Sequence, residues 1–153
     1  MKIMDILVKD AVVLNLASDD KNEILREMSQ ALADSEPSVS AERLLEVLIE
    51  REGLQSTGIG EGVAIPHGKM PGLDHLMASF ARSPEGADFD SIDGKPTQLF
   101  FLLVVPERSG GHHLKALARI SRFFRDSAFR EKLIDATSTD DIFRAIDEED
   151  AKF

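Results

Sequence analysis

The run LFFLLVV at residues 99–105 decides the fold class of this chain. Apolar side chains at consecutive positions are typical of a central strand that is covered on both faces of its sheet. A sheet buried in this way needs helices on each side. The run therefore predicts an α/β architecture in which helices flank a sheet.

Three further segments are typical of strands. Residues 11–16 and 76–81 are β-prone, and a short apolar run lies at residues 63–65. That run follows four glycines in ten residues, 53–62, a composition that disfavours a regular helix. Strands and helices do not alternate strictly along the chain. We therefore expect a single-domain sandwich with a mixed β-sheet, whose strand order the sequence leaves open.

Helices are expected where apolar residues recur at helical spacing. Residues 18–20 can cap the first helix and Ser40 the second, while Gly53 offers a left-handed stop that places Arg51 at the end of the second helix. The five expected helical segments are residues 24–32, 44–49, 113–124, 129–134 and 142–146.

Composition limits the possible functions. The 153 residues, 42% of them hydrophobic, fit one domain spanning residues 1–153. A balance of 28 acidic against 18 basic residues disfavours nucleic acid as a partner. The absence of Cys excludes disulfides, thiolate metal sites and a cysteine nucleophile. The first residues show neither a signal peptide nor a membrane span, so we expect a cytoplasmic protein.

The glycine-rich segment does not fit a nucleotide site. The stretch GIGEGV at residues 58–63 lacks the third glycine of the dinucleotide fingerprint. The stretch GKM at residues 68–70 has neither the upstream glycine nor the Ser/Thr of a P-loop. Nucleotide binding is therefore disfavoured.

The stretch STGIGEGVAIPHG at residues 56–68 resembles the phosphorylation-site motif of enzyme IIA of the fructose/mannitol type, from the bacterial phosphoenolpyruvate-dependent phosphotransferase system. Within that family the chain is most similar to the free-standing nitrogen-regulatory enzyme IIA, along its whole length. The resemblance implies the α/β fold of that family and no cofactor. It also implies that His67 is the phosphorylated residue and that Arg51 and His113 share its active site, with His112 as an adjacent alternative to His113.

The chemistry of these residue types fits that role. An imidazole with a pKa of about 6.5 is mostly neutral at cytoplasmic pH and offers one nitrogen lone pair to phosphorus. A backbone carbonyl that accepts from Nδ1 of His67 would leave its Nε2 free to attack. Pro66 and Gly68 would orient the ring and give a partner access.

The charge on a transferred phosphoryl group needs partners of its own. The guanidinium of Arg51 suits this task, and the hydroxyls of Ser56 and Thr57 are candidate phosphate-binding donors. Without the motif, His67 would be read as an ordinary surface histidine and Arg51 as a counter-charge to nearby glutamates.

Other polar and aromatic groups have simpler interpretations. The acidic residues 147–150 read as a solvated helix end, and Phe123 and Phe124 as core. His67, His75, His112 and His113 show no metal-ligand spacing, so no metal site is expected.

Four functions remain to be separated. The leading one is a phosphohistidine carrier that is loaded by an HPr-like phosphocarrier and regulates other proteins. The runner-up is a sugar-specific enzyme IIA that passes phosphate to a separate enzyme IIB. A non-catalytic binding module and a metal-dependent hydrolase are the alternatives of other classes. The sequence leaves open the acceptor, the oligomeric state and whether phosphate moves onward.

Overall fold

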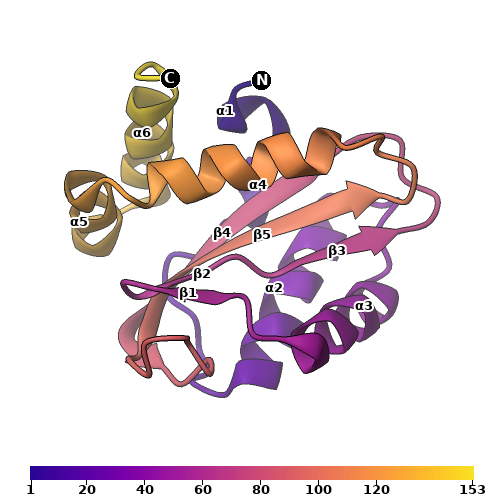
Figure 1. Ribbon diagram of the computed structural model, residues 1–153, viewed down its shortest axis with the longest axis horizontal. Coiled ribbons are helices and arrows are strands. Elements are labelled where there is room, and N and C mark those ends of the chain that lie inside the picture. Colours follow the sequence, from indigo (N-terminus) through magenta and orange to yellow (C-terminus); the bar gives the residue numbers. More distant parts are fainter.

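A computed structural model describes residues 1–153 and has one five-stranded sheet at its centre (Figure 1). Strand β5 pairs antiparallel with β4 along one edge, and parallel with β2 and then β3 along the other. Strand β1 pairs antiparallel with β2. The strands are β1 (Gly58–Gly60), β2 (Val63–Ala64), β3 (His67–Met70), β4 (Met77–Ala87) and β5 (Thr97–Pro106). The predicted mixed sheet is confirmed.

Helices cover both faces of this sheet, with α4 on one side and α2 and α3 on the other (Figure 1). Alternate side chains of β5 enter two cores, so that Phe101 and Leu103 pack with α4 to α6, while Phe100 and Leu102 pack with α2 and α3. The prediction that residues 99–105 are covered on both faces is therefore correct. None of the helices combines the length and hydrophobicity that a membrane span requires. The helices are α1 (Ile3–Ile6), α2 (Lys21–Ser35), α3 (Ala41–Leu54), α4 (His112–Phe123), α5 (Ser127–Asp135) and α6 (Thr139–Asp150).

Residues 11–16 do not form the regular strand that their composition predicts. A short 3₁₀ turn, η1 (Lys9–Ala11), takes up the first residue of this segment and interrupts the extended backbone there. The segment joins β4 through an isolated parallel bridge from Val13 to Ala81 and through a separate hydrogen bond from the N–H of Leu16 to the carbonyl of Arg82. It therefore covers the edge of β4 without continuing the sheet, because the turn breaks the two-residue period on which a ladder depends.

Helix α3 does not stop at Gly53 as its sequence suggests. The helix continues to Leu54, and its C-cap is Gln55 in an extended conformation. Gly53 is not among the residues with positive φ. The prediction of a left-handed stop is wrong, whereas the position of Arg51 in the last turn is correct.

The acidic segment 147–150 is only partly a solvated helix end. The carboxylate of Asp150 is buried and accepts from the backbone N–H groups of Ile3 (2.8 Å) and Met4 (2.9 Å). It also forms a 3.0 Å ion pair with Arg119 of α4. Sequence spacing does not indicate this burial, because the partners of Asp150 are distant in sequence and include the N-terminal helix, which lies near the C-terminus (Figure 1).

Phe123 and Phe124 are core residues, as predicted. Both are buried, and their ring centroids lie 5.6 Å and 5.4 Å from that of Phe129 in α5. These contacts attach the end of α4 to the following helix.

Candidate functional site

His67 is the first residue of β3, where that strand begins to pair with β5 opposite Leu103. Strand β3 pairs with β5 alone, so its other edge is free. Successive side chains of a strand point to opposite faces. The position of Gly68 lies against Val47 and Leu48 of α3, so His67 points to the other face, which α4 covers. The half-buried ring therefore emerges at the sheet edge between α3 and α4.

The ring of His67 is held by one hydrogen bond. Its Nδ1 lies 2.9 Å from the backbone oxygen of Ile65. A carbonyl oxygen only accepts, so Nδ1 carries the proton and Nε2 keeps its lone pair. This is the tautomer that the sequence analysis expects of a phosphoryl acceptor.

The surroundings favour the neutral ring. Burial is the largest cause that lowers the pKa of His67 below its ordinary value of 6.5, and the Arg51 guanidinium and His113 act in the same direction. The Ile65 hydrogen bond and the Glu52 carboxylate act against this pKa shift. Near neutral pH the ring is thus uncharged and Nε2 is available as a nucleophile.

A cavity of about 440 Å³ opens beside this ring. It brings together His67, Arg51 and His113, the three residues that the family resemblance assigns to the active site. Two further charged side chains, Lys69 and Glu50, also line it. The remaining lining residues come from α3, β3, β5 and α4: Val47, Leu54, Gly68, Val105, Leu114 and Leu117.

The orientation of the Arg51 side chain is set by a hydrogen bond at the end of its own helix. Its Nη1 donates to the backbone oxygen of Gln55 at 2.7 Å. Arg51 forms no ion pair with the three glutamates that it could have balanced, Glu46, Glu50 and Glu52. Glu46 lies 3.9 Å from Arg43 and Glu52 lies 3.0 Å from Lys21, while Glu50 lines the cavity with Arg51. The guanidinium is therefore available to an anion in the cavity.

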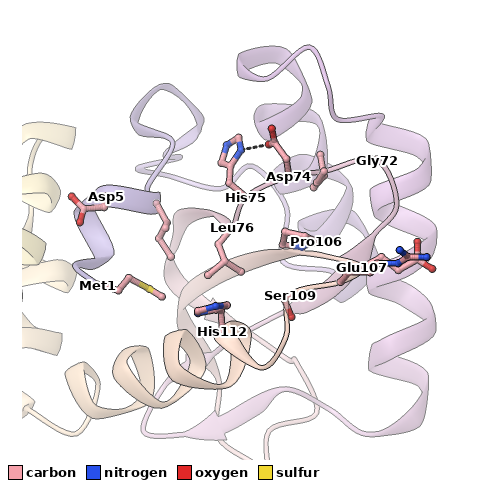
Figure 2. Close-up of a pocket in the computed structure, with 13 residues that line it drawn as sticks. Met1, Asp5, Gly72, Asp74, His75, Leu76, Pro106, Glu107, Ser109 and His112 are labelled. Atoms are coloured by element: carbon pink, nitrogen blue, oxygen red, sulfur yellow. Dashed lines mark hydrogen bonds and ion pairs between the residues drawn. The ribbon is translucent and has the colours of Figure 1, made fainter.

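The structure separates the two adjacent histidines. His113 lines the cavity with His67, and its Nδ1 lies 2.7 Å from Oγ of Ser109. His112 lines a different cavity of about 550 Å³, together with Met1 and Leu76 (Figure 2). Neighbouring residues on a helix point about 100° apart, so only one of the pair faces His67.

Ser56 and Thr57 are not brought to the cavity. The hydroxyl of Ser56 donates to the backbone oxygen of Phe89 at 2.7 Å, and that of Thr57 donates to the Glu52 carboxylate. Their role as phosphate-binding donors stays a prediction, and in this arrangement each hydroxyl already has another acceptor.

Gly68 has a packing role that the sequence analysis did not foresee. A Cβ at this position would lie 2.4 Å from Cγ1 of Val47. The missing side chain lets β3 approach α3, on the face opposite the His67 ring. Gly68 also lines the cavity beside His67, so the expectation that it gives a partner access stays a prediction.

Lys69 is the site residue that the sequence analysis missed. It lies two positions after His67 on the same strand, which places both side chains on one face. The sequence analysis did not expect a strand at residues 67–70, so the shared face of His67 and Lys69 was not predicted. With Arg51 and Lys69, the site offers a neutral nucleophile, His67, beside two cations.

In the whole chain, His, Asp and Glu side chains form no group of three or more that could hold a metal ion.

Comparisons with known proteins cover almost the whole chain. Residues 5–149 match the family described as "Phosphoenolpyruvate-dependent sugar phosphotransferase system, EIIA 2". A nitrogen regulatory protein of Bradyrhizobium diazoefficiens is 42% identical over 133 residues, which are 87% of this chain and 86% of that protein. The fructose-specific EIIABC component of Bacillus subtilis is 35% identical over 150 residues, which are 98% of this chain and 24% of that protein.

A solved structure agrees with these matches. The crystal structure of nitrogen regulatory protein IIA-Ntr from Neisseria meningitidis superposes with a TM-score of 0.87 at 36% identity. The superposition covers 94% of this chain and 98% of that one.

Proposed function

The chain belongs to the EIIA 2 family of the phosphoenolpyruvate-dependent sugar phosphotransferase system, and from this membership we propose that His67 carries a phosphoryl group received from an HPr-like phosphocarrier protein. The phosphorylation state of the chain then acts as a nitrogen-type regulatory signal in the cytoplasm. One observation carries the proposal: the neutral ring of His67, tied at Nδ1, shares a cavity with Arg51 and His113.

The proposed transfer of a phosphoryl group to His67 needs no general base, so the protein has mainly to position the reacting groups. The Nε2 lone pair of His67 forms a bond to phosphorus while the bond from phosphorus to the donor breaks, and its electron pair returns to the donor. No proton has to leave Nε2. The ring gains positive charge, which the Ile65 carbonyl stabilises through Nδ1–H. Arg51 and Lys69 offset the charge on the phosphoryl oxygens.

The rim of the cavity suits a protein donor. Leu54 and Leu114 line it from opposite helices, with 81% and 61% of their surfaces exposed. Large apolar side chains on both sides of a nucleophile are typical of a surface that another protein covers. This supports loading by a carrier protein.

A second function shares the same chemistry. The B. subtilis relative is named a fructose-specific EIIABC component, so this chain is also a candidate for passing phosphate to a separate enzyme IIB in sugar uptake. The nitrogen-type proposal is favoured because the B. diazoefficiens relative matches over most of both proteins. Incubating the phosphorylated chain with a cognate enzyme IIB separates the two, since only the sugar-specific function requires onward transfer.

The proposal is tested by reconstituting the transfer. Phosphoenolpyruvate, enzyme I, an HPr-like phosphocarrier and the chain are mixed, and intact mass is expected to show one acid-labile phosphoryl group. We expect none on His67→Ala, because its nucleophile is gone. The control His75→Ala removes an exposed histidine outside the His67 cavity and should be phosphorylated normally. Phosphorylated His67→Ala would overturn the proposal.

Arg51→Ala measures the contribution of the guanidinium in the same assay. Loss of one pre-oriented cationic donor should slow transfer on the order of 10²-fold. The helix should remain folded, since Arg51 is only partly buried. Rapid-quench rates and circular dichroism check both expectations, and an unchanged rate would refute the assigned role.

A further inference from the structure

We propose that Glu52 is a positioning residue for phosphoryl transfer, whose buried carboxylate holds the ring of His67 through the backbone of Thr57 and Ile65. The same carboxylate steadies the turn that directs Arg51. The inference rests on the proposed function but concerns a residue outside the reacting groups, because Glu52 does not line the cavity.

Glu52 is buried and fully engaged. Only 4% of its side chain is exposed, although it lies in the last turn of α3. Its two oxygens accept from the N–H of Thr57 at 3.2 Å and 3.1 Å, and one of them also accepts from the Thr57 hydroxyl. Lys21 of α2 supplies the counter-charge at 3.0 Å, and its Nζ lies 4.8 Å from the ring centroid of Phe89. A buried carboxylate is retained at such a position only when it is paired and hydrogen-bonded.

A continuous set of hydrogen bonds leads from this carboxylate to the nucleophile. Glu52 holds both donors of Thr57, and the carbonyl of Thr57 accepts from the N–H of Ile65 at 3.0 Å. The carbonyl of Ile65 in turn accepts from Nδ1 of His67 at 2.9 Å. The direction of that last carbonyl selects the tautomer with a free Nε2. Glu52 therefore fixes the geometry on which nucleophilic attack depends.

The orientation of the Arg51 guanidinium depends indirectly on the same Glu52 carboxylate. The contacts between Glu52 and Thr57 close a turn over residues 52–57. Gln55, whose carbonyl accepts from Arg51 at 2.7 Å, lies inside this turn. If the turn opens, the acceptor that directs Arg51 moves with it. The buried carboxylate of Glu52 thus positions both the nucleophile His67 and the cation Arg51, which line the cavity from different elements.

The negative charge of Glu52 also acts on the ring. It raises the pKa of His67 against the larger effect of burial. Removing the charge should therefore lower that pKa further, an effect that a purely mechanical support would not have.

The first test is Glu52→Gln, which keeps the shape of the side chain and removes its charge. We expect the maximal rate of phosphorylation to fall about tenfold to hundredfold, with little change in the KM for the phosphocarrier, because Glu52 lies away from the cavity rim. Nitrogen-15 NMR of the His67 ring should show a lower pKa and a mixture of tautomers. The matched control Glu46→Gln removes the same charge from an exposed position on the same helix and should change neither readout.

A pair of substitutions at Thr57 tests the next link. Thr57→Val keeps the volume but removes the hydroxyl donor, and we expect a slower rate and a disturbed His67 tautomer. Thr57→Ser keeps both donors and should restore most of the wild-type behaviour. This pair decides the matter if Glu52→Gln fails to fold.

Failure of the positioning role and failure of the proposed function would give different results. Wild-type rates and unchanged ring signals in both Glu52→Gln and Thr57→Val would overturn the positioning role. If the wild-type chain accepts no phosphoryl group at all, the proposed function fails instead. The NMR comparison then still decides whether Glu52 positions the ring, because it needs no donor protein.

Discussion

His67 is a residue whose neighbours act on its charge in opposite senses. Burial favours the neutral ring and is the largest influence on its pKa. The Ile65 carbonyl and the Glu52 carboxylate favour the protonated ring, but they do not outweigh burial. The result is a ring that is uncharged yet held in one orientation. Such a ring combines a free lone pair with a fixed direction of attack.

This balance predicts a pH dependence. NMR titration of His67 should give an inflection below 6.5, since its pKa is lowered from that value. Between the folded-state pKa and 6.5 the unfolded chain binds more protons at this site, so the folded state loses stability as pH falls through that window. Urea midpoints measured across the window should fall more steeply for wild type than for His67→Gln. Equal slopes would contradict the lowered pKa.

Strand β3 depends on a close approach to helix α3. Gly68 faces Val47, whose β-branched side chain has little freedom on a helix. This contact sets the position of the strand that carries His67 relative to the helix that carries Arg51. The glycine therefore links the packing of two elements to the geometry of the site.

Gly68→Ala should push the two elements apart. We expect a loss of about 1 to 3 kcal/mol in the free energy of unfolding, because the added Cβ overpacks the contact with Val47. Adding Val47→Ala should recover part of this loss. Gly53→Ala is the matched control, since a Cβ there meets nothing within 4 Å, and it should be neutral or slightly stabilising. Denaturant unfolding measures all three variants, and a neutral Gly68→Ala would argue against the close approach.

The two ends of the molecule are joined through one carboxylate. Asp150 of α6 accepts from the first backbone N–H groups of α1 and pairs with Arg119 of α4. These contacts fasten three helices together on one face of the sheet. They lie away from the His67 cavity, so they bear on stability more than on transfer.

Asp150→Ala should destabilise the whole chain by about 2 to 4 kcal/mol, because it leaves the N–H groups of Ile3 and Met4 without their acceptor and Arg119 without its counter-charge. Asp147→Ala removes an exposed charge from the same helix and should stay within about 0.5 kcal/mol of wild type. Denaturant midpoints compare the two. A small effect of Asp150→Ala would show that the ends of the chain hold together without this contact.

Features that depend on neighbours along the chain were predictable. The apolar run at residues 99–105 indicated a strand with two buried faces, and the expected hydrogen bond from Nδ1 of His67 to a backbone carbonyl is present. The role of His67 that the motif at residues 56–68 implies stays a prediction. Both signals are local, since a strand repeats every two residues and a motif needs no distant partner. The same local reasoning failed at residues 11–16, where a 3₁₀ turn interrupts the extended backbone, and at Gly53, where the helix continues to Leu54.

Only the folded chain decided which side chains meet. His113 rather than His112 lines the cavity of His67, and the Thr57 hydroxyl donates to Glu52 instead of facing the cavity. Asp150 is buried by residues from the opposite end of the sequence. The physical reason is common to all three: composition and spacing set which element forms, whereas the direction of a side chain depends on how separate elements pack and where each buried polar group finds its partner.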